Sequence, residues 1–297
     1  MFIEIREQGK KKKYYLIHTY RDNGKVKRIS RYLGSNLREE KLQKLKKTAE
    51  QHILEQIKER NILEFELTKK EIEEYEKYEK DIEIKHLQTL NWKRFTEDFT
   101  YNTNAIEGST VALSEVRELL GGKEKPQDDE DIETLDVAGA VEYIKKSKEK
   151  ITVDFIKHLH LLCFKGTKKF AGKLRNVNVV IRDVHGNIVH QGAQINKVKC
   201  LLNELGIWYY KHKKKYPPLL LAAVMHNQFE KIHPFQDGNG RVGRLLLNYV
   251  LLQHKYPPIN IHLRDRGRYY KCLQKYDYKN DIKSTLKFLI SQYKKQS

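Results

Sequence analysis

The chain is 297 residues long, which is enough for a sizeable apolar core in one large domain or in a small domain joined to a larger one. Its 58 Lys and Arg residues exceed its 39 Asp and Glu residues, and a formal net charge of +19 suits a phosphate-bearing ligand, nucleic acid or an acidic protein. No apolar run approaches the roughly 18 residues of a membrane span and the N-terminus has no signal-peptide core, so we expect a cytoplasmic protein without a membrane partner. Three cysteines without CxxC spacing disfavour a disulfide framework and a zinc site.

Residues 1–35 are expected to form a basic β-hairpin unit. Two β-prone stretches flank Asn23-Gly24, a pair that favours the tight turn of a hairpin. The first fifty residues carry 15 basic and 6 acidic side chains. The hairpin can serve as a platform for nucleic acid or can be a small sheet that packs on its neighbours, and the second is more common. The platform would use three tyrosines among the lysines: Tyr14, Tyr15 and Tyr20.

Residues 36–90 are expected to form a charged helical region, because Leu and Ile recur every three to five positions among Glu and Lys. The expected break lies near residues 61–68. Thr68 is a candidate N-cap for the second helix, since its hydroxyl can accept a hydrogen bond from a free backbone N–H.

Residues 91–297 read as mainly α-helical. A helix is expected over about 92–106, where Gly108 ends it, and a short one follows Ser114. Residues 121–133 are expected to be an exposed loop, because glycines, a proline and acidic residues gather there. Further helices are expected over 136–146, 152–164, 194–211 and 219–231.

Residues 172–193 interrupt the helices with a predicted β-hairpin. Its first strand alternates Val177, Val179 and Ile181, and a turn is expected at residues 185–187. A lone hairpin buries itself poorly, so an inserted one suggests a function. It can hold an extended segment of a partner by strand addition.

Residues 233–244, HPFQDGNGRVGR, gather groups that together suit phosphoryl-type transfer. Pro234 forces a loop after one helix, and Gly238-Asn239-Gly240 begins the next, where exposed backbone N–H groups can bind an anion. Arg241 and Arg244 lie one turn apart and can face the same anion.

Two further residues of this segment supply a base and a metal ligand. Asp237 would repel a phosphate unless a cation such as Mg²⁺ lay between them, and His233 can accept a proton near pH 7. A metal hydrolase that uses His226, His233 and Asp237 is a remote alternative, since the spacing is not HExxH.

The segment matches the signature HxFx(D/E)GNGRxxR at every specified position, and the chain over about residues 90–295 resembles the Fic (Fic/DOC) family. Further landmarks are LHLLCF, GKLR, HNQFEKIHPF and RYYKCLQKYD. The resemblance implies a Fic-type helical bundle with a β-hairpin flap. It also implies a protein adenylyltransferase, which transfers AMP from ATP to a Tyr, Ser or Thr hydroxyl of a protein and releases pyrophosphate.

By the same resemblance, His233 is the general base, Asp237 binds Mg²⁺ and Phe235 anchors the loop. The expected nucleotide-binding residues are Gly238, Asn239, Gly240, Arg241 and Arg244, with Tyr269 and Tyr270 near the nucleobase and Asp277 where the family often has Asn. The flap residues that align the target are Val179, Val180 and Ile181.

TNAIEG at residues 103–108 fits the family's inhibitory pattern (S/T)xxxE(G/N), within an inhibitory helix of about 92–107. It implies that Glu107 pairs with Arg244 and keeps that arginine from the γ-phosphate. Removal of AMP by a water that Glu107 orients, a nucleic-acid-binding regulator that uses the basic N-terminal region, and a homodimer remain alternatives or additions.

Overall fold

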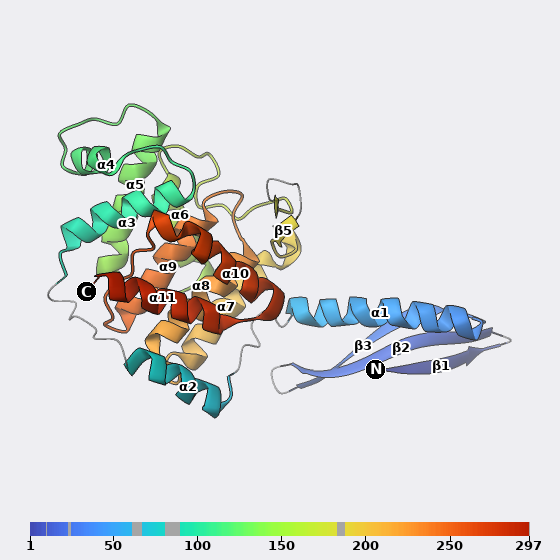
Figure 1. Cartoon of the computed structure of the whole chain (residues 1–297). Helices are drawn as coiled ribbons and strands as arrows, with labels where there is room; N and C mark the ends of the chain where they lie inside the picture. The colour runs from blue at the N-terminus through green and yellow to red at the C-terminus, as the bar shows by residue number, and fades with distance from the viewer. Residues whose placement is uncertain (10, 23–24, 61–66, 81–89, 183–187, 297) are drawn as a thin grey trace. The chain divides into compact units, whose positions relative to one another are not determined.

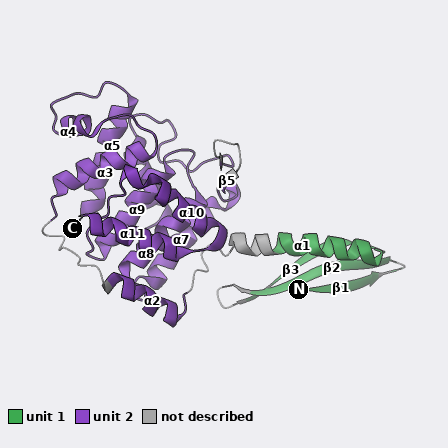
Figure 2. Cartoon of the chain, viewed as in Figure 1, with its two compact units in different colours: residues 1–64 green, residues 65–297 purple. Residues whose placement is uncertain are grey.

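The computed structural model describes residues 1–297 except 10, 23–24, 61–66, 81–89, 183–187 and 297. The chain divides into two compact units, residues 1–64 and residues 65–297 (Figure 2). Of the two helices expected over residues 36–90, the first belongs to the N-terminal unit and the second to the larger one.

The N-terminal unit is a three-stranded antiparallel sheet with a helix along one face. The strands β1 (Phe2–Gln8), β2 (Lys11–Asp22) and β3 (Lys25–Ser35) lie in the order β1-β2-β3. Helix α1 (Glu39–Arg60) contacts β2 and β3 (Figure 2). Strands β2 and β3 confirm the predicted hairpin, whose Asn23-Gly24 turn lies outside the described residues, whereas β1 was not predicted. The buried residues of this unit include Leu16, Ile29, Ala49 and Ile53.

The larger unit is mainly helical, as predicted, and α8 (Pro218–Ile232) and α9 (Asn239–Gln253) lie at its centre (Figure 1). Both are buried along most of their length, and their buried residues include polar side chains such as His226, Asn227 and Arg244 as well as apolar ones. The surrounding helices are α2 (Lys69–Lys80), α3 (Trp92–Ile106), α4 (Leu113–Leu120), α5 (Asp129–Lys146), α6 (Val153–Phe164), α7 (Val198–His212), α10 (Arg266–Lys279) and α11 (Ile282–Gln296). Among the described residues, no helix is both long enough and apolar enough to cross a bilayer.

Helix α5 begins seven residues earlier than expected and takes in most of the acidic cluster that was predicted as loop. Asp128 is its N-cap and accepts a hydrogen bond from the Asp131 backbone N–H at 3.0 Å. Acidic side chains in a first turn are stabilised by the free N–H groups and the positive end of the helix dipole. The cluster at residues 128–131 is therefore a helix start.

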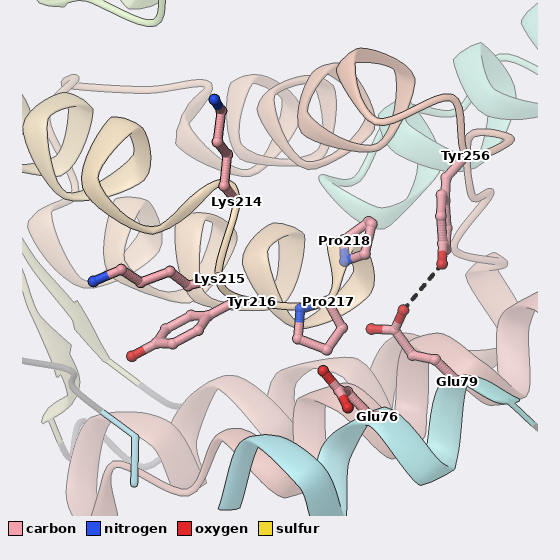
Figure 3. Close-up of a pocket in the computed structure, with 8 residues that line it drawn as sticks. All are labelled: Glu76, Glu79, Lys214, Lys215, Tyr216, Pro217, Pro218 and Tyr256. Atoms are coloured by element: carbon pink, nitrogen blue, oxygen red, sulfur yellow. Dashed lines mark hydrogen bonds between the residues drawn. The ribbon is translucent and has the colours of Figure 1, made fainter. Parts of the chain in front are cut away.

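Helix α2 begins as predicted at Thr68, which exchanges hydrogen bonds with Glu71 in a capping box. Its far end binds the start of α8 through Glu79 (Figure 3). The Glu79 carboxylate accepts from the Leu219 and Leu220 N–H groups at 3.1 and 3.2 Å and from the Tyr256 hydroxyl at 3.2 Å. Burial nevertheless raises the pKa of Glu79 to about 7.

The inserted hairpin is present as β4 (Val180–Arg182) and β5 (Ile188–Gln191), paired antiparallel. Its expected turn at residues 185–187 lies outside the described residues. The pair follows α6 and precedes α7, so a short sheet stands between the helices of the larger unit.

Candidate functional site

The loop between α8 and α9 is fastened by its own side chains. The Asn239 amide accepts from the Phe235 N–H and donates to the Phe235 carbonyl, both at 2.9 Å. The Phe235 ring is fully buried and stacks on His160, with 3.9 Å between centroids. Because its amide is used inside the loop, Asn239 can offer an anion only its backbone N–H, as the first residue of α9.

The start of α9 is open to close approach because two glycines lack side chains. Gly238 has φ +78°, and a Cβ there would lie 2.2 Å from Phe164 Cε2. A Cβ on Gly240 would lie 2.2 Å from Glu107 Oε1. The Glu107 carboxylate therefore lies against the first turn of α9, where backbone N–H groups and the helix dipole favour an anion.

His233 ends α8 in the left-handed conformation, with φ +51°. Its Nδ1 lies 3.3 Å from the Glu230 carbonyl oxygen, which can only accept a hydrogen bond, so Nδ1 carries the proton and Nε2 keeps a lone pair. Burial lowers the pKa of His233 to about 4. The imidazole is therefore neutral at pH 7 and can take up a proton.

Arg175 holds the base of the hairpin against this loop. Its buried guanidinium donates to the His233 carbonyl at 2.7 Å, to the Val177 carbonyl at 2.7 Å and to the Ala193 carbonyl. Arg175 thus joins both ends of the hairpin to the residue that ends α8, and it fixes the backbone of His233.

Arg244 is almost fully buried in α9, and its donors face α3. Its Nε donates to Thr103 Oγ1 at 2.7 Å, and its Nη2 donates to the Thr103 carbonyl at 2.9 Å and to Glu107 Oε1 at 2.8 Å. Burial disfavours the charged form, but Glu107 outweighs that effect and raises the pKa of Arg244. The predicted pairing of Glu107 with Arg244 is present in the structure.

Arg241 and Asp237 lie on the other side of the α9 start. Arg241 pairs with Glu133 of α5, packs over the Phe164 ring at 4.2 Å and has one nitrogen 3.9 Å from Asp237 Oδ2. The Asp237 side chain is 52% exposed, and its Oδ1 accepts from the Gly238 N–H at 2.6 Å. One accessible carboxylate fits Mg²⁺ that is held together with phosphate oxygens.

The hairpin presents apolar side chains beside this loop. Val180 and Ile181 are 45% and 42% exposed, while Val179 is half-buried and its carbonyl accepts from the Gly192 N–H at 3.1 Å. His190 of β5 contacts Asp277 of α10 at 2.5 Å, and its ring centroid lies 5.2 Å from that of His233.

In comparison with known proteins, residues 150–251 match the sequence model of the Fic/DOC family. These residues form a Fic/DOC domain. Two curated relatives are named protein adenylyltransferase Fic. The one from Nematostella vectensis is 30% identical over 198 residues, 64% of this chain and 45% of the relative. The one from Drosophila ananassae is 32% identical over 197 residues, 64% of this chain and 38% of the relative.

Among solved structures, a Fic-domain-containing signalling protein from Bacteroides thetaiotaomicron has a TM-score of 0.65 and 26% identity, over 75% of this chain and 92% of that one. This Fic chain spans less than half the length of the two curated relatives.

One residue that was expected near the nucleobase, Tyr269, is buried in the core. Tyr269 is only 2% exposed, and its hydroxyl lies 3.0 Å from His226 Nε2 and 3.4 Å from Arg244 Nη1. It therefore supports Arg244 from within the core and has no free ring face. Tyr270 is half-buried and donates to the Ile106 carbonyl at 3.4 Å, so it remains the candidate for an aromatic contact.

Two residues that contact this site were not predicted from the sequence. Glu133 pairs with Arg241, although residue 133 was assigned to an exposed loop. His160 accepts from the Gly172 N–H at 2.8 Å, and its Nε2 lies 3.1 Å from the Asp237 carbonyl. The helical period of LHLLCF, which directs one face inward, was the available signal for His160.

Proposed function

We propose that this Fic domain is a protein adenylyltransferase that transfers AMP from ATP to a hydroxyl group of a protein. The observation that carries the proposal is the arrangement of three groups along one loop and the helix that follows it: a neutral imidazole at His233, a helix start without side chains at Gly238 and Gly240, and a buried cation at Arg244 of α9. The names of the curated relatives support the same activity.

The proposed reaction uses His233 Nε2 as the general base. The nitrogen takes the proton of the target hydroxyl while that oxygen forms a bond to the α-phosphorus of ATP. The bond between the α-phosphorus and the bridging oxygen breaks, and pyrophosphate leaves. Because Nδ1–H is held by the Glu230 carbonyl, Nε2 is the nitrogen that is free to accept.

The start of α9 and its arginines are proposed to bind the phosphates. The backbone N–H groups of Asn239 and Gly240 would form the anion site, and Arg241 and Arg244 would supply the balancing charge. Asp237 would hold Mg²⁺ together with phosphate oxygens, and such an ion supplies charge neutralisation to the phosphates.

Glu107 is proposed to restrain the enzyme. Its carboxylate pairs with Arg244 and lies against Gly240, so it takes the place of an anion at both groups. A single pair at about 4 Å and an effective dielectric near 20 attracts by roughly 4 kcal/mol before desolvation and side-chain entropy reduce it. An attraction of this size can bias how ATP binds without abolishing its binding.

The paired strands β4 and β5 are proposed to hold the protein target. Strand addition to β4 or β5 would supply backbone hydrogen bonds, and the exposed side chains of Val180 and Ile181 would contact the target beside His233. The target carries a Tyr, Ser or Thr hydroxyl, and the protein's own tyrosines make self-modification a suitable readout.

The test is the intact mass of three purified proteins after incubation with ATP and Mg²⁺: wild type, Glu107→Gly and Glu107→Gly/His233→Ala. We expect added AMP on Glu107→Gly and none on the double variant. Equal labelling of wild type and Glu107→Gly would contradict the restraint, and labelling of the double variant would contradict the base. If no variant gains mass, loss of AMP from an already modified protein becomes the reaction to assay.

A further inference from the structure

The second face of the N-terminal sheet differs from the face that α1 covers. Leu16 and Ile29 pack with Ala49 and Ile53 of α1, and they mark the covered face. Side chains alternate along a strand, and directly paired residues share a face. Tyr15 and its cross-strand partners Glu4 and Tyr32 therefore lie on the opposite face, against which no helix of the described residues of this unit packs (Figure 2). On the same face, Ile17 of β2 is fully buried.

The open face carries exposed aromatic rings. Phe2 and Tyr32 are each 54% exposed, and they belong to the two outer strands. Between them, Tyr15 of β2 packs against Tyr32, with 5.3 Å between ring centroids. Large exposed rings on one face of a soluble unit indicate a contact surface. Tyr14 and Tyr20, which sequence reasoning placed in the platform, alternate onto the covered face.

Basic side chains surround these rings. The Arg6 guanidinium lies 4.4 Å from the Tyr15 ring centroid, and Glu4 pairs with both Arg6 and Arg28. The Arg6 and Arg28 side chains remain about half exposed, at 51% and 49%. Lys13 pairs with Arg6 across the strands and shares the face, so three cations accompany one carboxylate. The whole unit of residues 1–64 carries 17 basic and 9 acidic residues, a net charge of +8.

From this arrangement we propose that the open sheet face binds single-stranded nucleic acid. Bases would stack on Tyr32 and Phe2, and phosphates would contact Arg6, Arg28 and Lys13. Every base has a π-face, whereas a duplex keeps its bases stacked on each other, so exposed rings favour a single strand. An acidic peptide would satisfy the cations but would leave the rings unused. The proposal does not depend on AMP transfer.

The test uses the full chain and a fluorescent oligothymidylate of about 15 nucleotides, within reach of one stacking platform. Anisotropy titrations at several salt concentrations compare wild type, Tyr32→Ala and Arg28→Gln. We expect Tyr32→Ala to weaken binding about tenfold, because one stacking contact is lost. Arg28→Gln should weaken binding and reduce the slope of log K against log salt by about 0.7, the value for one phosphate contact.

Two matched controls separate this face from general charge and exposure. Tyr278→Ala removes another exposed tyrosine, 65% exposed, and Lys44→Gln removes an exposed charge of α1 in the same unit. Both should bind like wild type. Phe2→Ala replaces Tyr32→Ala if circular dichroism shows that the latter is unfolded. The proposal is overturned if the oligonucleotide shows no saturable binding, or if Arg28→Gln and Lys44→Gln weaken binding equally. It is also overturned if the protein binds duplex more tightly than single strand and Tyr32→Ala leaves that binding unchanged.

Discussion

Gly243 of α9 and Glu230 of α8 lie so close that a Cβ atom on Gly243 would be 2.2 Å from Glu230 Oε1. That oxygen is buried, and no described residue forms a hydrogen bond with it. Burial raises the pKa of Glu230 to about 8 even though Arg244 lowers it, so the carboxyl is mostly protonated at neutral pH. Gly243 thus leaves room for an uncharged carboxyl between the two central helices.

Replacing Gly243 with Ala should therefore destabilise the larger unit. Alanine normally stabilises a helix interior by about 1 kcal/mol relative to glycine, but overpacking against Glu230 should cost roughly 1–3 kcal/mol. Urea unfolding measures the net change. The matched control is Gly139→Ala in α5, where no atom lies within 4 Å of the new Cβ and the variant should be more stable than wild type. Equal gains in both variants would contradict the close packing.

Glu79→Gln should change how stability depends on pH. The pKa of Glu79 is raised from its ordinary value of 4.5 to about 7 in the folded chain, so the folded state binds the proton more tightly. The free energy of unfolding should then fall as pH rises from about 4.5 to 7, by on the order of 3 kcal/mol. Glutamine cannot ionise, so its unfolding free energy should exceed that of wild type at pH 8 and not at pH 5. Parallel pH profiles of the two proteins would refute this.

The pKa of His233, lowered to about 4, predicts where the rate of AMP transfer falls on the acid side of the pH–rate profile. A general base must be neutral, so a lowered pKa moves the loss of activity to lower pH. AMP transfer by Glu107→Gly should persist at pH 5.5 and fall toward pH 4, well below the roughly 6.5 of an ordinary histidine. Initial rates of self-modification across pH would measure this, with circular dichroism to confirm folding. A limb centred near 6.5 would mean that His233 is more solvated than its surroundings indicate.

The His190–Asp277 contact is expected to hold the hairpin of β4 and β5 against α10. It joins β5 to α10, and Asp277→Asn would keep the shape while removing the charge. Backbone hydrogen exchange at the Gly192 N–H, which donates to the Val179 carbonyl, should become faster in Asp277→Asn and in His190→Ala. Since one contact is lost in either case, the double variant should add little beyond the single ones. Unchanged exchange, as expected for Tyr278→Ala, would show that the hairpin is held elsewhere.

The sequence predicted the helical unit, the hairpins and the 233–244 loop because each rests on a local signal. Apolar spacing located α6, α8 and α9, and the Pro-Gly pattern located the loop. The failures required information from distant residues. The start of α5 depends on the Asp128 cap, and the burial of Tyr269 depends on contacts with His226 and Arg244. Strand β1 pairs only with β2, so its short apolar pattern carried little weight alone.

The burial of Arg244 links the activity of the site to the stability of the fold. The charge of a guanidinium that is only 2% exposed is costly to bury unless an opposite charge balances it. Among the described residues, Glu107 is the carboxylate that pairs with it. Removing that carboxylate leaves a buried cation with only neutral partners, which is costly to fold. An activated variant should thus melt at a lower temperature than wild type and regain more of that loss when a nucleoside triphosphate binds. The nucleotide would then be a structural ligand of the active enzyme as well as its substrate.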